Sequence, residues 1–131
     1  MSGKEEKMGN KERGVKFINL TPHPITFSRA SDGVVYEIPV SGHVLHAEFR
    51  NEPAGKHASG IALVTPRLVP APGSLELLAR IEAENPGGVI VGSLIAAQTF
   101  PGRVVSCISA AGFERLPAAQ KRMRDDLFTI F

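Results

Sequence analysis

Short stretches of the chain alternate apolar and polar residues, which is the pattern of half-buried β-strands. Residues 15–20, 25–28 and 34–38 are read as strands, and residues 25–28 show this alternation first. A Ser-Asp-Gly turn signal at residues 31–33 separates the second stretch from the third, so these two are predicted to form a β-hairpin. Residues 21–24, Thr-Pro-His-Pro, interrupt the pattern, because each proline holds the residue before it in an extended conformation.

Residues 43–50 alternate as well, and the pattern predicts that Leu45, Ala47 and Phe49 face the core. Residues 51–59 are polar and contain a proline and a glycine, which indicates a loop. Residues 60–65 are the next predicted strand, and the prolines that follow it predict an irregular, extended segment. The first half of the chain is therefore expected to be a meander of antiparallel strands.

Helical signals are confined to the second half of the chain. Ser74 is the predicted N-cap of a helix whose apolar stripe comprises Leu77, Leu78 and Ile81, and Asn-Pro-Gly-Gly at residues 85–88 ends it. Ser93 is expected to cap a brief helix through residue 97, and Pro117 to begin a last helix.

Three further stretches in the second half are read as strands. Residues 89–91 and 103–108 are apolar and short, and residues 127–131 are assigned to a strand in preference to a continued helix. The elements together predict an α+β, β-dominated domain. A small antiparallel barrel and a two-layer sandwich, each with two or three short helices, both satisfy the pattern.

The length of 131 residues fits one domain, which we expect to span residues 15–131. Residues 1–14 are polar and charged and are predicted to be a disordered tail. The tail carries four positive and three negative side chains, and the remainder carries eleven and ten. Because positive charge is concentrated in neither part, the composition disfavours a dedicated electrostatic binder of nucleic acid.

Other features of the composition concern the cell compartment and the source. A single cysteine allows no internal disulfide, and no apolar stretch is long enough for a signal peptide or a membrane span. The expected location is the cytoplasm, with no membrane partner. Only four asparagines and two glutamines are present, against ten prolines, which favours a hot source.

Thr21 and His23 form the first candidate site, for a ligand or an interaction. The prolines on either side of His23 fix the backbone around an imidazole that can act as an acid, a base or a ligand near neutral pH. No partner acid or nucleophile lies at a mechanistic spacing, so a rigid bridge between two strands is the favoured interpretation.

Neither a metal site nor a catalytic cysteine is predicted. His43, His46, His57 and Cys107 have the right chemistry for zinc, but His43 and His46 are three residues apart on a predicted strand and point to opposite faces. Cys107 lies in an apolar strand, where a buried thiol stays inert. No phosphate-binding glycine motif is present, so no cofactor is predicted.

A basic cluster near the C-terminus is the second candidate site, for nucleic acid. It comprises Arg115, Lys121, Arg122 and Arg124. The neighbouring acids Glu114, Asp125 and Asp126 offset most of this charge, so a solvated helix face is favoured over a phosphate-binding surface.

Residues 19–23, Asn-Leu-Thr-Pro-His, resemble the opening of a family of small uncharacterised proteins of phages and bacteria. Pro-Val-Ser-Gly at residues 39–42 and Ile-Val-Gly-Ser-Leu-Ile-Ala-Ala at residues 90–97 are similar to two later motifs of that family, and Pro-Gly-Arg at residues 101–103 to a third. As a whole the chain resembles a hypothetical protein of a spherical virus of hyperthermophilic archaea. The resemblance implies a viral setting, in the host cell or the virion, and no mechanism.

The favoured hypothesis is an accessory protein of a virus or mobile element that binds another macromolecule, either another protein or a second copy of itself. It rests on the absence of a catalytic set from the sequence. Two alternatives are kept: a small-ligand-binding protein or enzyme centred on His23, and a nucleic-acid-binding protein that uses residues 115–124.

Overall fold

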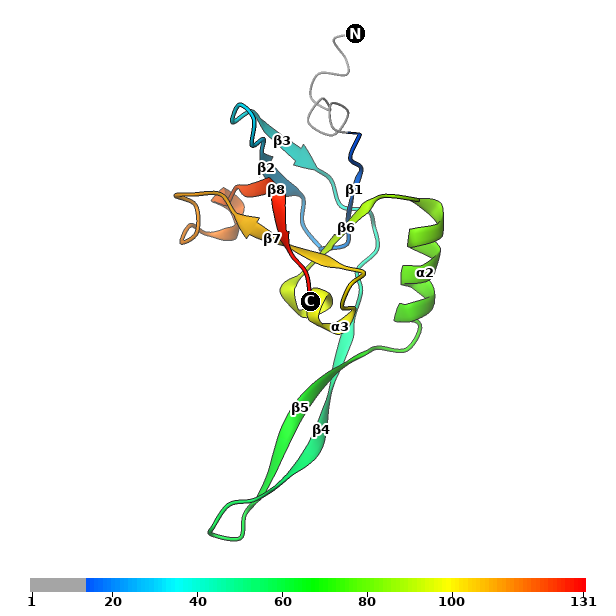
Figure 1. Ribbon diagram of the computed structural model, residues 1–131, viewed down its shortest axis with the longest axis vertical. Coiled ribbons are helices and arrows are strands. Elements are labelled where there is room, and N and C mark those ends of the chain that lie inside the picture. The colour runs from blue at the N-terminus through cyan, green and yellow to red at the C-terminus, as the bar shows by residue number, and fades with distance from the viewer. Residues whose placement is uncertain (1–13) are drawn as a thin grey trace.

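The computed structural model describes residues 14–131, so the predicted tail lies, apart from Gly14, outside the described residues. Six strands form one strongly curled sheet that is nearly closed into a barrel (Figure 1). Their order around the sheet is β1 (Phe17–Asn19), β6 (Val89–Gly92), β7 (Val105–Ser109), β8 (Met123–Thr129), β2 (Ile25–Ser28) and β3 (Val35–Ile38). The β-dominated α+β class predicted from the sequence is confirmed.

The predicted hairpin is present, because β2 and β3 pair antiparallel with Phe27 opposite Tyr36. The predicted meander is wrong. Strand β1 pairs in parallel with β6, β6 with β7, and β2 with β8, so only the β2–β3 and β7–β8 pairs of this sheet are antiparallel. After β3 the chain leaves the sheet and returns at β6 beside β1. Such a long crossover permits parallel pairing that local alternation does not reveal.

The two faces of β1 lead to two separate hydrophobic cores. Phe17 points into the barrel, where its ring lies 4.9 Å from that of Phe27 and 5.6 Å from that of Phe128, measured between centroids. Ile18 points outward and packs against the helices with Leu78, which is fully buried. The period-two alternation read from the sequence therefore holds for β1.

Two helices cover the outer core: α2 (Ser74–Glu84) and α3 (Leu94–Thr99). Ser93 caps α3 as predicted, because its Oγ accepts a hydrogen bond from the Ala96 N–H at 3.1 Å. The predicted Ser74 cap is wrong. Gly73 is the N-cap, and the Ser74 hydroxyl instead donates to the His46 carbonyl at 3.1 Å.

The predicted last helix is also wrong. Pro117 precedes only a single 3-10 turn, Ala118–Gln120, and the following residues form β8. Strand β8 begins well before the predicted residue 127 and lies between β7 and β2. Its pairing with two neighbours outweighs the modest local helix signal.

A two-stranded arm extends away from the barrel, as Figure 1 shows. It consists of β4 (Ala47–Lys56) and β5 (Ala62–Pro70), which, among the described strands, pair only with each other. The predicted loop at residues 51–59 is therefore largely strand, with the turn confined to its end. Of the residues expected to face the core, Leu45 is buried, but Phe49 lies on the arm and is 65% exposed.

Asn19 joins the two ends of the curled sheet. Its side-chain Nδ2 donates to the Ile38 carbonyl of β3 at 3.3 Å and to the His23 carbonyl at 2.8 Å, and its backbone carbonyl accepts from the Ser41 N–H at 3.0 Å. Asn19 is only 1% exposed, and its hydrogen bond to Ile38 is buried. These bonds connect β1 to the end of β3 and the residues after it, where no ladder between the described strands closes the barrel.

We expect Asn19→Ala to destabilise the protein by about 1–3 kcal/mol, because the buried Ile38 carbonyl loses a donor and the Thr21 N–H loses its acceptor. Thermal unfolding followed by circular dichroism should show a Tm lower by roughly 5–15 °C. Asn51→Ala, the same change at an exposed site on the arm, is the control and should shift stability by no more than about 0.5 kcal/mol. Equal effects of the two changes would contradict the role of Asn19 at this junction.

Candidate functional site

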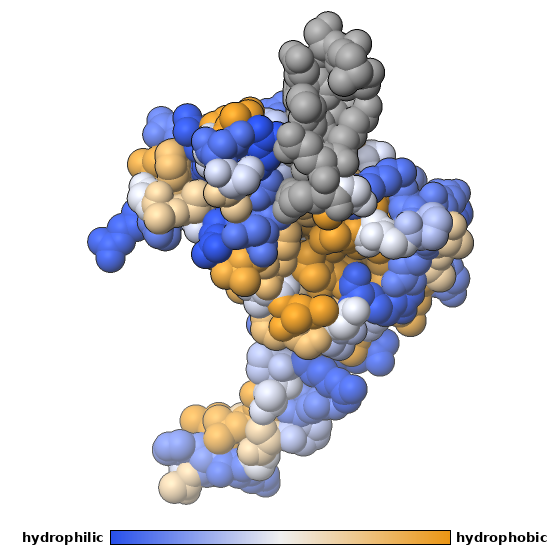
Figure 2. Space-filling model, turned by 45° about the horizontal axis from the view of Figure 1, so that its top comes forward, coloured by the Kyte–Doolittle hydropathy of each residue, from blue (hydrophilic) through white to orange (hydrophobic). Residues whose placement is uncertain are grey.

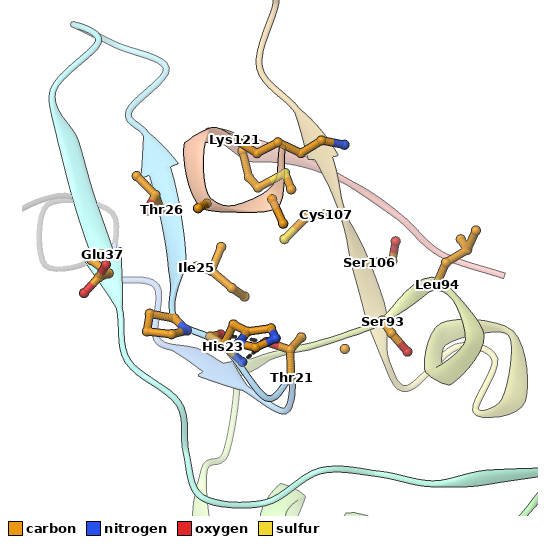
Figure 3. Close-up of a pocket in the computed structure, with 15 residues that line it drawn as sticks. Thr21, His23, Ile25, Thr26, Glu37, Ser93, Leu94, Ser106, Cys107 and Lys121 are labelled. Atoms are coloured by element: carbon orange, nitrogen blue, oxygen red, sulfur yellow. Dashed lines mark hydrogen bonds between the residues drawn. The ribbon is translucent and has the colours of Figure 1, made fainter. Parts of the chain in front are cut away.

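A hollow of about 730 Å³ opens on the barrel surface between β2 and β7. The turn at Thr21 and His23 forms one side of it, and Lys121 and the 3-10 turn form the opposite side (Figure 3). Ile25 and Cys107 point into it from the two strands. Its size falls in the range typical of small-molecule sites, and its lining is apolar with a few polar groups.

Thr21 and His23 are positioned by Asn19. The Thr21 N–H donates to Asn19 Oδ1 at 2.9 Å, and the Thr21 hydroxyl lies 2.7 Å from the same oxygen and 2.8 Å from the His23 carbonyl. These bonds satisfy the backbone of the turn locally. The structure therefore supports the rigid bridge that the sequence predicts, and it identifies Asn19, which was not among the candidate residues, as the side chain that holds it.

The imidazole of His23 is exposed at the edge of the hollow. Glu37 and Ser106 line the same hollow, so an acid and a hydroxyl share the concave surface with it. Within residues 14–131, however, no side chain forms a hydrogen bond or ion pair with this imidazole, and the carboxylate of Glu37 points away from the hollow in Figure 3. The arrangement suits binding better than proton transfer.

Cys107 is a poor nucleophile in this setting. Burial raises the pKa of its thiol from 9.0 to about 12, so the thiol is protonated at neutral pH. Only the thiolate attacks electrophiles or ligates metals efficiently. The inert role predicted from the sequence agrees with this shift.

The four zinc candidates are distributed over the molecule. His46 lies at the base of the arm, whereas His57 lies in the turn at its far end, where Nδ1 is 2.9 Å from the Ser59 hydroxyl. His43 lies in the segment before β4 and Cys107 on β7. Among the residues that the structure describes, no three His, Cys, Asp or Glu side chains are grouped to hold a metal ion.

The four basic candidates do not share a helix face. Arg124 forms hydrogen bonds to both carboxylate oxygens of Asp126 at 2.9 and 3.0 Å, and Arg122 lies 5.0 Å from the ring centroid of Phe113. Lys121 borders the hollow, and Arg115 is exposed in the loop before the 3-10 turn. Because two of the four interact with other side chains, the structure adds no support for a phosphate-binding surface.

The arm is a second candidate surface, which the sequence reading assigned partly to the core and partly to a loop. Its apolar side chains are exposed: Ile61 by 66%, Phe49 by 65%, Val64 by 55% and Leu63 by 44%. Figure 2 shows hydrophobic residues gathered along its outer half. Neither hydrophobic core includes an arm residue. Exposed apolar surface of this kind marks interaction sites.

Comparison with protein-family models, with curated proteins and with solved structures gave no match to this chain. None of the helices in residues 14–131 combines the length and the apolar character required to cross a membrane. The hollow and the arm are therefore the two features of the molecule that indicate a function.

We expect Cys107 to react slowly with iodoacetamide in the folded protein. A pKa of about 12 leaves about a thousandfold less thiolate at pH 8 than the ordinary pKa of 9.0 would. The rate of alkylation, followed by intact mass, should rise about tenfold per pH unit in the folded state and should be much faster in denaturant. Equal rates in the folded and denatured protein at pH 8 would show that the thiol is neither buried nor shifted.

Proposed function

We propose that this protein is a macromolecular binding module whose contact surface is the β4–β5 arm and whose partner is a protein. In the viral or mobile-element setting that its sequence resemblance implies, it acts as an accessory protein, in the host cell or in the virion. The observation that carries the proposal is the exposure of apolar side chains along a projecting arm that neither core covers.

The register of the arm separates its two faces. Residues directly opposite in an antiparallel pair lie on the same face, so Phe49 shares a face with Leu68, and Pro53 with Val64. The other face carries charge, including an ion pair of 3.3 Å between Arg67 and Glu52. One face is thus predominantly apolar and the other polar, although both are exposed. Soluble monomers normally bury such an apolar strip, which supports an external partner.

The first test removes apolar side chains from the arm. We expect the double variant Phe49→Ser/Val64→Ser to lose association, with itself or with a protein partner, while stability changes by no more than about 0.5 kcal/mol because both sites are exposed. Light scattering of the pure protein and crosslinking in infected or host cells measure association.

Leu75→Ser/Ile130→Ser is the matched control. These two residues are 48% and 59% exposed but lie outside the arm, so association should be kept. A wild-type protein that is monomeric and retains no partner would contradict the proposal. So would association that the arm substitutions leave unchanged.

The hollow beside His23 favours a second candidate function, the binding of a small organic ligand. Apolar groups such as Ile25 and Met123 would contact its body, and His23, Ser106 and Lys121 offer hydrogen bonds or charge. Because the imidazole has no side-chain partner among the described residues, we propose binding without catalysis.

A fragment screen by NMR tests this second candidate. Binding fragments should shift the amide signals of His23 and Ser106, and Ala118→Phe, which places a ring in the hollow, should abolish the shifts. Ala111→Phe, in the exposed turn after β7, is the control and should leave them intact. Shifts that map elsewhere, or that persist in Ala118→Phe, would refute a site in this hollow.

A further inference from the structure

The open edge of the arm is on β4, and the register fixes which residues it offers. Backbone groups of an antiparallel pair alternate between pointing at the partner strand and pointing away from it. The Ala71 N–H donates to the His46 carbonyl at 3.1 Å, so His46 and Ala71 face each other as a hydrogen-bonded pair. The next pair, Ala47 and Pro70, must therefore point its backbone groups outward.

The positions of the prolines in the arm independently support this alternation of inward and outward pairs. Counting on from Ala47 and Pro70, every second pair points outward, and the outward positions are Ala47, Phe49, Asn51 and Pro53 on β4 and Pro70, Leu68, Pro66 and Val64 on β5. All three prolines of the two strands occupy outward positions, where no N–H is needed inside the ladder.

The two edges differ in what they can pair with. On β5 the prolines at 66 and 70 remove alternate outward N–H groups, which blunts that edge against strand addition. On β4 three successive outward residues, Ala47, Phe49 and Asn51, keep both N–H and C=O. Among the described residues, none of the hydrogen bonds between loops, turns and strands uses these groups.

We propose that the arm pairs with the arm of a second copy of this chain, strand β4 against strand β4 in antiparallel orientation about a two-fold axis at Phe49. The inference rests on the proposed function, because it names the partner of the same arm. About that axis Phe49 faces Phe49 of the second copy, and Ala47 faces its Asn51. The pair of residues 47 and 51 occurs twice, once on each side of the axis. Together with the Phe49 pair it uses every outward N–H and C=O of residues 47, 49 and 51.

The register centred on Phe49 is distinguished from its neighbours by backbone chemistry. An axis at Asn51 would place Phe49 opposite Pro53, which has no N–H to donate. An axis at Ala47 would place Asn51 opposite residue 43, which precedes β4 and lies in the segment leading to the arm. Only the Phe49 axis pairs Ala47, Phe49 and Asn51 entirely with one another.

The charges on the polar face fit this register. Between the hydrogen-bonded pairs, Glu48 of each copy lies opposite Arg50 of the other, which gives two opposite-charge pairs across the junction. Both side chains are exposed, and within residues 14–131 neither has an ion pair of its own. On the other face the apolar strips of the two arms become continuous at Phe49.

Strand addition also explains how so exposed an arm is maintained. An isolated two-stranded hairpin is marginally stable in water, whereas three or more strands with a hydrophobic face are stable. The dimer converts two separate ribbons into one four-stranded sheet in which the open β4 edges cover each other and the proline-blunted β5 edges lie outermost.

The test is sedimentation analysis of the full chain over a range of micromolar concentrations. The wild type should be a dimer. Asn51→Pro removes an outward N–H without touching the hairpin ladder and should raise the dimer Kd by about tenfold or more. Leu68→Pro is the same change on the β5 edge, which lies outermost in the four-stranded sheet and already carries prolines on either side, and it should leave the dimer unchanged.

A charge exchange tests the register without relying on proline. Glu48→Arg alone and Arg50→Glu alone place like charges opposite each other twice, and each should weaken the dimer by about tenfold. The double variant E48R/R50E restores opposite charges and should recover the wild-type Kd. A dimer that neither Asn51→Pro nor the single charge changes weaken would overturn the inference.

The outcomes separate this inference from the function on which it rests. A chain that is monomeric at every concentration overturns the β4 pairing, but the proposed function stands if a retained protein partner is lost in Phe49→Ser/Val64→Ser. If neither a dimer nor a partner depends on the arm, both proposals fail.

Discussion

The buried amide of Asn19 is the contact on which the rest of the barrel depends. Parallel pairing to β6 fixes one end of the sheet at β1, and the antiparallel β2–β3 hairpin forms the other end. Among the strands that the structure describes, no ladder joins these ends. The hydrogen bonds from the Asn19 side chain to the Ile38 and His23 carbonyls, and that from the Ser41 N–H to the Asn19 backbone carbonyl, connect them. The hydrogen bond to the Ile38 carbonyl is buried, so its loss would leave polar groups without a partner away from water.

This junction also determines where candidate chemistry lies. Because Asn19 and Thr21 bind the backbone of the turn, the imidazole of His23 is held at the rim of the hollow and takes no part in closing the barrel. The hollow itself exists because β8 meets β2 only from Phe27 onward, which leaves Ile25 without a neighbouring strand on that side. A protonated thiol and an imidazole that has no side-chain partner within residues 14–131 suit a binding surface.

The arm and the body of the protein differ in how far their apolar side chains are buried. The body buries its apolar residues in two cores on opposite faces of one sheet, whereas the arm, beyond its base beside α3, is a single layer with both faces exposed. Its prolines are restricted to positions where the ladder needs no N–H, so they blunt one edge and leave the other open. Stability and recognition are thus carried by separate parts of the chain.

The amino-acid sequence alone determined those features that depend on residues close together in the chain. They are the alternation of β1, the turn between β2 and β3, the apolar stripe of α2 and the Ser93 cap. Tertiary structure alone decided which segments pair with one another and which faces are covered. Phe49 reads as a core residue because alternation shows that a strand has two faces, but not whether anything covers one of them. The role of Asn19 and the strand at Met123–Thr129 likewise depend on segments distant in sequence, since hydrogen-bond partners and strand neighbours are chosen only when the chain folds.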